Sequence, residues 1–496
     1  MRVEVAARQV VLDVVAVRAW AAGALTACRA ARELIDAVNV FPVPDADTGS
    51  NVTLTLAGGA AAVAADRGLD GPAALLATFA HGAARAARGN SGIILSQWLV
   101  GLSAGLAGTT PAGRDSTADL VGGLESAARA ARDAVPDPQE GTVLTVAREV
   151  ATHARRALQR APGSPADVLA AATDAARADL DRLSASHHVL RAARVVDAGA
   201  CALIVVLDAL VHTLRTGGLA LQEADLDLAW LPRAGPEVVG GCAPASGGAY
   251  EVMMLVRPTW PGVDDLAVAL QDVGDAVAVV DAGGSRHAHV HCDDPAAAIA
   301  LVPDAAREQV VVRRVDEPAP ADRGLVVLTL SPGLSAWYAT CGAVTLVGPD
   351  PDVEQVARAA VDTRAGRAVV VGAGVGPAAG ALADPCFDLV ATTGDGPAVV
   401  ACLALVADPQ VTPAAGRDAL RRLRAAAPAG VDEVPEVVAA LLADVHAAQG
   451  VTLVHGTDVD GATARATADV LSAAHPQLEV VVAGPAAGAA WWVGVD

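Results

Sequence analysis

NVFPVPDADTGSN, residues 39–51, separates two long apolar stretches that have helical spacing. The segment is too rich in Pro, Asp and Gly for a helix, so it predicts a shaped loop. Apolar residues recur at helical spacing from Val10 to Val38 before it, and the pattern resumes from Val52 to Asp66 after it. The local fold predicted here is therefore two helices joined by a proline-stiffened acidic loop.

Asp45 and Asp47 lie two positions apart on this loop, where alternate side chains can converge on one face. Mg²⁺ prefers a few carboxylates together with phosphate oxygens, so the pair suits a magnesium nucleotide. The alternative is a turn followed by a helix cap, because Asp is common in turns and residues 48–51 offer hydroxyl and amide groups that could cap a helix beginning near Val52. This segment alone does not distinguish the metal site from the turn and helix cap.

The helical pattern continues outward from the loop over the first part of the chain. Strand-like alternation is scarce before residue 215, which predicts an all-α domain over residues 1–215. The further predicted helices cover Pro72–Arg88, Ser91–Leu106, Ala118–Ala134, Gly141–Leu158, Pro165–Leu183 and Gly199–Leu214.

The pattern changes after the turn-rich stretch 216–248. EVMMLVR, AVAVVDA and HAHVHC are typical of short strands, which predicts a small α+β domain over residues 216–322. From Leu325 buried strand runs alternate with helical segments, an order that favours a parallel sheet and an α/β domain over residues 323–496. The predicted fold class is thus multidomain, α and α/β.

Composition limits the classes of function. At 496 residues the chain is long enough for about three domains, and 53% hydrophobic with 18% charged residues indicates a globular protein. A formal net charge of -21 disfavours nucleic acid as a partner. The sequence contains no lysine, so the lysine-dependent phosphate loop of Walker A proteins is excluded, and a bound nucleotide would be neutralised by magnesium and arginine.

Compartment signals point to the cytoplasm. The amino-terminal stretch is interrupted by Glu4, Arg8 and Asp13 and lacks the apolar run of a signal peptide, and the most apolar run, Val195–Leu210, is short of a membrane span. We therefore expect no transmembrane segment. Seven scattered cysteines form no CxxC pair and are expected to be reduced.

Three further segments carry candidate binding residues. In HGAARAARGNSGIILSQ, residues 81–97, a Gly-rich turn precedes an apolar helix and could offer backbone NH groups to phosphate, although an ordinary N-cap has the same appearance. QEGTVLTVARE, residues 139–149, and VVDAGA, residues 195–200, each pair a glycine with a polar residue ahead of an apolar run. None of the three is specific alone.

Taken together in their sequence order, NVFPVPDADTGSN, ARGNSGIILSQ, EGTVLTVARE and VVDAGA resemble the nucleotide-binding domain of bacterial fatty acid kinases, itself similar to the ATP-binding subunit of dihydroxyacetone kinases. The resemblance is dense over residues 5–215, moderate across the middle and thin in the last 170 or so residues. It implies a DhaL-like helical barrel that binds ATP at one end through two magnesium ions.

The resemblance also implies roles for individual residues. Asp45 and Asp47 match the catalytic metal-binding aspartates, with Ala46 in place of the glycine usual between them, and alanine is tolerated there unless its φ must be positive. Asn39 is a possible further ligand or orienting group. The remaining positions expected to bind the cofactor are Thr48, Gly49 and Asn51 after the acidic loop, Gly89, Asn90, Ser91 and Gly92 in the phosphate loop, and Thr142, Asp197 and Gly199 around adenine and ribose.

In the family the acceptor is a fatty-acid carboxylate presented by a separate DegV-like binding protein, and the product is an acyl phosphate. A carboxylate is ionised at pH 7, so no general base is required. The resemblance favours a homodimer and a role in phospholipid metabolism. A glycerone-type kinase with another small acceptor and a non-catalytic nucleotide-sensing protein are the alternatives.

The middle domain carries HAHVHCDDP, residues 287–295, similar to the family's HVHTDDP. His289 and His291 share one face of a strand, a spacing that suits two zinc ligands, and hydrogen-bonded strand histidines are the alternative. The family's zinc-binding cysteine corresponds to Ala249 here, which leaves Cys242 or Cys292 as substitutes.

The last domain matches in outline a DegV-like α/β domain that would dock the fatty-acid-binding partner. Its GAGVGPAAG segment, residues 372–380, lacks the spacing of a dinucleotide fingerprint and is interpreted as a turn. In the first domain, His187 and His188 lie on a polar stretch and are expected to be solvated.

Overall fold

The computed structural model describes residues 12–42, 44–67, 70–107, 116–160, 163–232, 248–315, 323–349, 351–375, 387–445, 448–488 and 490–496. By its contacts the chain divides into two compact units. The first comprises Met1–Gly247 with Arg257–Val268 and Ala276–His289, and the second comprises Gly248–Val256, Ala269–Asp275 and Val290–Asp496. The predicted multidomain α and α/β fold class is confirmed.

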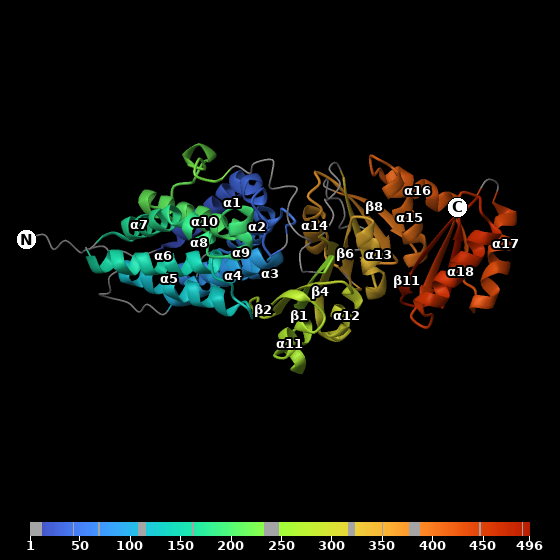
Figure 1. Ribbon diagram of the computed structural model, residues 1–496. Helices are drawn as coiled ribbons and strands as arrows, with labels where there is room; N and C mark the ends of the chain where they lie inside the picture. The colour runs from blue at the N-terminus through green and yellow to red at the C-terminus, as the bar shows by residue number, and fades with distance from the viewer. Residues whose placement is uncertain are drawn as a thin grey trace, which may run out of the picture. The chain divides into compact units, whose positions relative to one another are not determined.

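The first unit is a closed ring of helices (Figure 1). From α1 to α7 each helix packs against the next in sequence, and α10 closes the ring by packing against both α7 and α1. The bounds are α1 Val14–Asp36, α2 Thr48–Ala65, α3 Pro72–Arg85, α4 Gly89–Ala107, α5 Ser116–Asp133, α6 Val143–Arg160, α7 Pro165–Ala178, α8 Leu180–Ser184, α9 His188–Ala193 and α10 Ala198–Thr216, followed by the short 3-10 turn η1 Glu223–Asp225.

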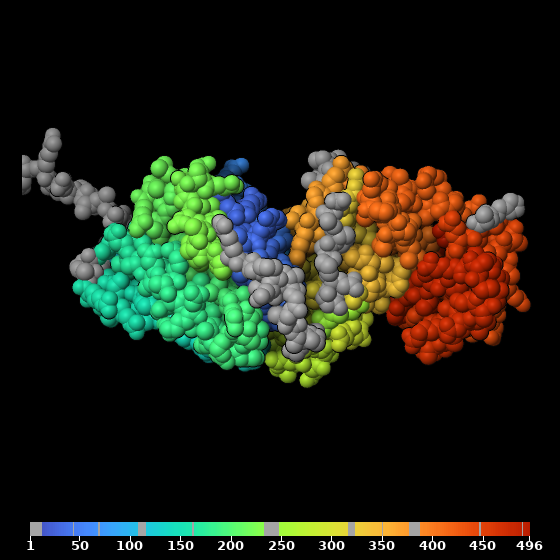
Figure 2. Space-filling view, turned by 45° about the horizontal axis from the view of Figure 1, so that its top comes forward, coloured from blue at the N-terminus to red at the C-terminus, as the bar shows by residue number. Residues whose placement is uncertain are grey.

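Apolar residues from every helix of the ring fill its interior, and the side chains close over this core on the face seen in Figure 2. Trp20, in the amino-terminal third of α1, is fully buried, and its indole NH donates to the carbonyl of Val206 on α10 at 3.2 Å. By length and composition α1 and α10 could also cross a membrane, but 50% and 72% of their apolar windows are buried in the barrel. This burial accounts for their apolar character as core helices.

The start of α2 differs from the sequence prediction, and the helix predicted over Pro165–Leu183 is divided into α7 and α8. The loop expected over residues 39–51 ends earlier, because α2 begins at Thr48 instead of near Val52. The carbonyl of Asp47 accepts the NH of Asn51 at 2.8 Å, so the TGSN segment forms the first helical turn. Ser and Thr are unfavourable inside helices yet tolerated in the first turn, where few backbone bonds depend on them.

Two sheets dominate the rest of the chain. The larger has the strand order β2-β3-β1-β4-β6-β5-β7-β8, and its β5, β6, β7 and β8 are parallel, as the alternating pattern predicted. The smaller has the order β11-β10-β12-β9. The strands are β1 Tyr250–Val256, β2 Asp275–Asp281, β3 Arg286–Cys292, β4 Arg307–Arg314, β5 Gly324–Thr329, β6 Ala343–Val347, β7 Ala368–Ala373, β8 Phe387–Thr392, β9 Arg424–Ala426, β10 Gly450–Gly456, β11 Glu479–Ala486 and β12 Trp491–Val495.

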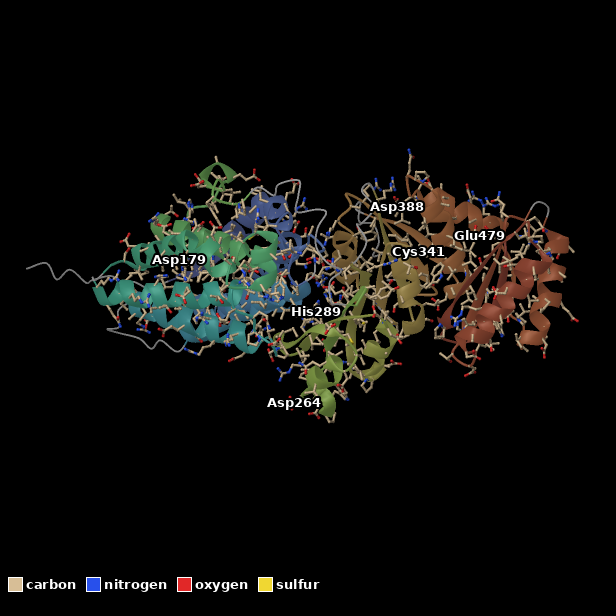
Figure 3. The ribbon with its side chains drawn as sticks, viewed as in Figure 1. Asp179, Asp264, His289, Cys341, Asp388 and Glu479 are labelled. Atoms are coloured by element: carbon tan, nitrogen blue, oxygen red, sulfur yellow. The ribbon has the colours of Figure 1, made fainter. Side chains whose placement is uncertain are left out.

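Short helices connect these strands. In the parallel sheet Asp388 on β8 pairs with Arg323 and Arg367, which precede β5 and β7, and so fastens the amino-terminal edge of three strands (Figure 3). The helices are α11 Leu266–Gln271, α12 Pro295–Ala300, α13 Ser335–Thr340, α14 Val353–Asp362, α15 Asp395–Ala407, α16 Pro413–Arg422, α17 Val434–Asp444 and α18 Gly461–Ala474, with 3-10 turns η2 Pro261–Val263, η3 Asp304–Ala306, η4 Pro332–Leu334 and η5 Val431–Glu433.

Within the first unit, β2 and the start of β3 pack on the helical barrel. Ala278 and Val280 of β2 share a small core with Ala87 and Ile93, which flank the start of α4. The side-chain amide of Gln97 donates to the carbonyl of Asp281 at 2.8 Å. Strand β2, which comes from the predicted middle domain, therefore packs against residues that flank the predicted phosphate loop.

Candidate functional site

The four sequence motifs lie at the amino-terminal ends of four long helices. The acidic loop leads into α2, the Gly-rich turn into α4, the EGTV segment into α6 and the VVDAGA segment into α10. Helix amino termini expose unpaired backbone NH groups and carry a partial positive charge that attracts anions. In a chain without lysine, this arrangement supplies positive potential from the backbone.

A hydrogen-bond network closes the acidic loop. The amide of Asn39 donates to Oδ1 of Asp45 at 2.7 Å, and the Thr48 hydroxyl donates to Oδ1 of Asn39 at 2.7 Å. The same hydroxyl lies 3.3 Å from Oγ of Ser91. The network thus brings together four residues expected at the nucleotide site. Asn39 and Asp45 lie on the acidic loop, and Thr48 and Ser91 lie at the starts of α2 and α4.

The two sides of the loop are also joined at its base. The carboxylate of Asp36, the last residue of α1, accepts the backbone NH of Ser50 at 3.1 Å and its hydroxyl at 2.8 Å. Asp47 is buried and occupies the N-cap of α2, although its side chain makes no capping hydrogen bond to that helix. The helix-cap alternative is wrong in position, because residues 48–51, which it expected to cap a helix near Val52, lie inside α2, and the Asp47 carboxylate at the N-cap makes no capping hydrogen bond.

The Gly-rich turn contains polar groups that its local structure does not fully satisfy. α4 begins at Gly89, and Oδ1 of Asn90 is buried with no hydrogen-bond partner among the residues that the structure describes. Buried polar atoms are nearly always paired, so an orphaned acceptor here indicates a missing donor or cation. The preceding Arg88 is buried against the turn and donates to the carbonyls of Ala86 and Ala87, a residue that the sequence motifs did not single out.

The starts of α6 and α10 form a second pair. Oδ2 of Asp197, the N-cap of α10, accepts the NH of Ala200 at 2.7 Å and the NH of Val143 at 2.8 Å. Burial raises the pKa of Asp197 to about 6, against the opposing effect of these two NH donors. The buried hydroxyl of Thr142 donates to the carbonyl of Gln139 at 2.8 Å, so it serves the local turn.

His187 connects the two pairs of helix starts. Its ring lies 4.2 Å, centroid to centroid, from that of Phe41 on the acidic loop. A side-chain carbon at Gly141, whose φ is +89°, would come within 2.9 Å of the His187 backbone and Cβ. The prediction that His187 is solvated is wrong, since it is 4% exposed, whereas its neighbour His188 is exposed as expected.

Three of the predicted site glycines are needed for packing. A Cβ at Gly49 would lie 2.4 Å from the carbonyl oxygen of Arg32, and one at Gly92 would lie 2.3 Å from Oγ1 of Thr55. At Gly199 an added Cβ would lie 3.2 Å from Oδ2 of Asp197. Gly89 has a φ of +55°, a conformation that favours glycine. The backbone can therefore approach closely at each helix start.

Ala46, between the two aspartates, has a φ of +52°. The left-handed region costs a non-glycine residue roughly 1–2 kcal/mol, so the loop holds the aspartates at the expense of local strain. Alanine was expected to be tolerated at position 46 unless its φ had to be positive, and its φ is positive here. Strain between two functional side chains is typical of sites where the surrounding structure fixes their orientation.

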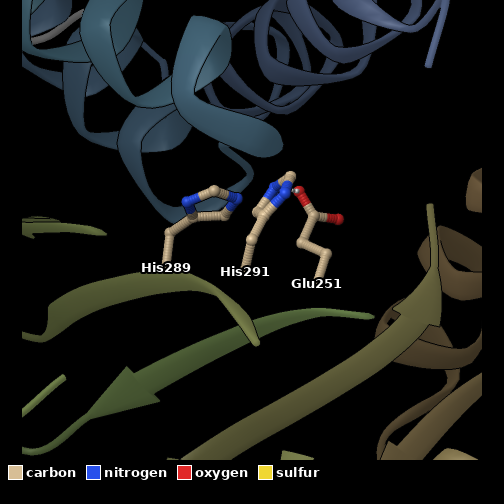
Figure 4. Close-up of side chains that lie close together, drawn as sticks. All are labelled: Glu251, His289 and His291. Atoms are coloured by element: carbon tan, nitrogen blue, oxygen red, sulfur yellow. Dashed lines mark ion pairs between the residues drawn. The ribbon is translucent and has the colours of Figure 1, made fainter. Parts of the chain in front are cut away.

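A second candidate site lies on β1 and β3. Glu251, His289 and His291 project from one face of the sheet, all three are buried, and their potential ligand atoms lie within 4.8 Å of one another (Figure 4). Nδ1 of His289 lies 3.0 Å from the carbonyl of Ala276, which leaves Nε2 as the metal-facing nitrogen. Two imidazoles and a carboxylate are a donor set that suits Zn²⁺.

The third residue of this cluster is one that the sequence motifs did not single out. Cys292 is absent from this cluster, and Cys242 lies outside the described residues. Glu251, two residues after Ala249, supplies an acidic group instead, with Oε1 at 3.9 Å from Nε2 of His291. It also pairs with Arg313 on β4, so the guanidinium and a metal would share this carboxylate.

Two known domain families match parts of this chain. Residues 42–212 match the DAK2 domain, and residues 247–311 match the FakA-like middle domain of fatty acid kinases. The DAK2 match spans all four helix starts described above.

Similar proteins include Protein YloV of Bacillus subtilis, 27% identical over 340 residues, and uncharacterized proteins of Staphylococcus epidermidis and Staphylococcus saprophyticus, 25% identical over 370 residues and 26% over 373. These matches cover 63% of this chain for YloV and 68% for the other two. They span 60% of the YloV sequence and 66% of each staphylococcal sequence.

The helical barrel also has a hollow of about 910 Å³ that contains none of the motif residues and lies outside the stretch that matches DAK2. It is lined by residues from Val15 to Thr26 of α1 and by residues 218–224. The acidic loop follows the opposite end of α1. This hollow is therefore separate from the candidate nucleotide site.

Replacing Ala46 by glycine should relieve the strain in the acidic loop. Because glycine adopts a φ of +52° without steric cost, we expect Ala46→Gly to raise the free energy of unfolding by about 1 kcal/mol. Ala61→Gly, on the exposed face of α2, is the matched control and should lower it by about 0.5–1 kcal/mol. Urea denaturation measures the free energy of unfolding of both variants. Equal destabilisation by the two glycine substitutions would contradict the strain inferred at Ala46.

The buried carboxylate of Asp197 predicts a pH dependence. Its folded pKa of about 6 exceeds the ordinary 3.8, so the protein loses stability as pH rises from about 4 to 6 and the unfolded state alone ionises. Asp197→Asn keeps an oxygen acceptor without the charge. Its free energy of unfolding should therefore rise relative to that of the parent by roughly 1–3 kcal/mol as the pH increases over that range.

Asp197→Ala is the control for the acceptor role. It leaves the NH groups of Val143 and Ala200 without this acceptor, so its free energy of unfolding should be about 1–3 kcal/mol below that of Asp197→Asn across the whole range. Urea unfolding at pH 4 and pH 7 separates the two effects. A parent and an Asn variant with identical pH dependence would show that the Asp197 carboxylate titrates normally.

Proposed function

We propose that this chain is the ATP-binding subunit of a fatty acid kinase, which transfers the γ-phosphoryl group of ATP to the carboxylate of a fatty acid held by a separate DegV-like binding protein. The product is an acyl phosphate, and the activity belongs to phospholipid metabolism in the cytoplasm. The proposal is supported by the DAK2 match together with the middle-domain match.

The observation that carries the proposal is the meeting of two helix starts beside two aspartates. The hydroxyl oxygens of Thr48 and Ser91, at the starts of α2 and α4, lie 3.3 Å apart. Asp45 belongs to the same network because Asn39 is hydrogen-bonded to both Asp45 and Thr48. A triphosphate placed here meets backbone NH groups and hydroxyls, while carboxylates on the adjoining loop hold divalent ions. The orphaned Asn90 acceptor fits a site that is completed by a ligand.

In this proposal two Mg²⁺ ions, held by Asp45 and Asp47, supply the charge that the lysine-free pocket lacks. Asn39 orients Asp45, and the hydroxyls and NH groups near Ser91 and Asn51 position the phosphates. An oxygen of the fatty-acid carboxylate forms the new bond to the γ-phosphorus as the bond to the β–γ bridging oxygen breaks, and ADP leaves. The chain's residues position and neutralise the reactants, and no residue needs to remove a proton.

The middle domain is proposed to hold a structural Zn²⁺ through Glu251, His289 and His291. These side chains would hold the ion through two imidazole nitrogens and a carboxylate oxygen, and the ion would crosslink β1 and β3. We further propose that the protein is a homodimer and that the last α/β domain docks the fatty-acid-binding partner.

The decisive assay follows phosphoryl transfer with the full chain. With ATP, Mg²⁺ and a DegV-like protein loaded with fatty acid, we expect acyl phosphate, trapped as a hydroxamate, and ADP in equal amounts. Asp45→Asn and Asp47→Asn should each reduce the rate at least about 100-fold, because they remove metal charge from the transferring group. Asp70→Asn, on an exposed turn, is the control and should leave the rate unchanged.

The same assay separates the alternatives. Transfer to dihydroxyacetone without the binding protein would identify a glycerone-type kinase. Magnesium-dependent ATP binding without turnover on any of these acceptors would favour a nucleotide-sensing protein. Activity that survives both aspartate substitutions would remove the metal assignment.

Metal analysis tests the middle domain independently. The purified chain should contain about one zinc by mass spectrometry, and Glu251→Gln, His289→Ala and His291→Ala should each lose most of it. His287→Asn is the matched control, since His287 lies on the same strand outside the cluster. A zinc-free parent that takes up no added zinc would support the hydrogen-bonded histidine alternative.

A further inference from the structure

His187 is a buried polar side chain that no part of the proposed phosphoryl transfer uses. It is 4% exposed, and its Nδ1 is buried with no hydrogen-bond partner among the residues that the structure describes. A buried imidazole normally satisfies its ring nitrogens, because an unmade hydrogen bond costs about 1–3 kcal/mol. A structural role in packing alone does not account for this nitrogen.

The ring stands where the two halves of the nucleotide site meet. Phe41, on the acidic loop, lies 4.2 Å away at an interplanar angle of 55°. On the other side the close approach of Gly141 brings in the start of α6, next to Thr142. Thr48, which contacts Ser91 of α4, follows the acidic loop that carries Phe41. His187 therefore lies next to Phe41 and next to Gly141, beside the Thr142 position where the family resemblance implies adenine and ribose.

The chemistry of the ring suits a nucleobase. Burial, followed by the nearby charges of His188 and Arg191, lowers the pKa of His187, so the ring is neutral at pH 7 and offers one donor and one acceptor. The edge of a purine likewise presents alternating donors and acceptors. The face of Phe41 adds an apolar wall against which a flat base can pack.

We propose that His187 is a specificity residue of the nucleotide site, whose Nδ1 hydrogen-bonds the edge of the purine base while Phe41 and the imidazole together form the wall of the base pocket. This inference rests on the proposed ATP site and adds the part of the nucleotide that the phosphate network does not recognise.

The test compares two probes that share their phosphates and differ in the base. Binding of MgATP and of magnesium tripolyphosphate is measured by titration calorimetry on the full chain. His187→Leu should weaken MgATP about tenfold and leave tripolyphosphate within twofold. His187→Asn, whose amide occupies the position of Nδ1, should restore MgATP binding to within about threefold. Asp70→Asn, on an exposed turn, is the control and should change neither.

Each outcome decides the proposal. Unchanged MgATP binding by His187→Leu, or an equal loss for both probes, would overturn the role of His187 while leaving the nucleotide site intact. A parent that binds neither probe would overturn the nucleotide site itself, and this inference with it. As a check independent of variant folding, ¹⁵N-histidine spectra of the parent should show the Nδ1 resonance of His187 shift with MgATP and not with tripolyphosphate.

Discussion

The hydrogen bonds that close the acidic loop onto the starts of α2 and α4 are the constraint on which the rest of this site depends. Thr48 links Asn39 to Ser91, and Asn39 in turn holds Asp45. These bonds fix Asn39 and Thr48, which are nine positions apart in sequence, together with Ser91 of α4. The helical ring makes this possible, because α2 and α4 must begin at the same end of the barrel for the contact to form.

The same ring shows where a chain without lysine offers positive potential. Four helices begin at the motif residues, so the potential comes from their backbone NH groups, and in the proposed function metal ions held by the aspartates would add to it. A net charge of -21 makes the rest of the surface repulsive to anions. Local geometry at the helix starts, and not overall charge, therefore determines where a nucleotide is stabilised.

Much of this arrangement could be predicted from the sequence, and the exceptions have physical causes. Helical periodicity placed the ring helices, because their apolar faces form one continuous core. The start of α2 was missed since Thr48–Asn51 has poor helix propensity, which matters little in a first turn. His187 was expected to be solvated because its sequence neighbours are polar; its burial comes from Phe41 and Gly141, which are distant in sequence. Glu251 was overlooked as a ligand because register between β1 and β3 is a tertiary property.

The most direct test of this account is a crystal structure of the full chain with Mg²⁺ and a non-hydrolysable ATP analogue. The account predicts divalent ions about 2.1 Å from carboxylate oxygens of Asp45 and Asp47, with the phosphates against Ser91 and the starts of α2 and α4. A nucleotide bound elsewhere, with both aspartates directed to solvent and no ion beside them, would contradict it.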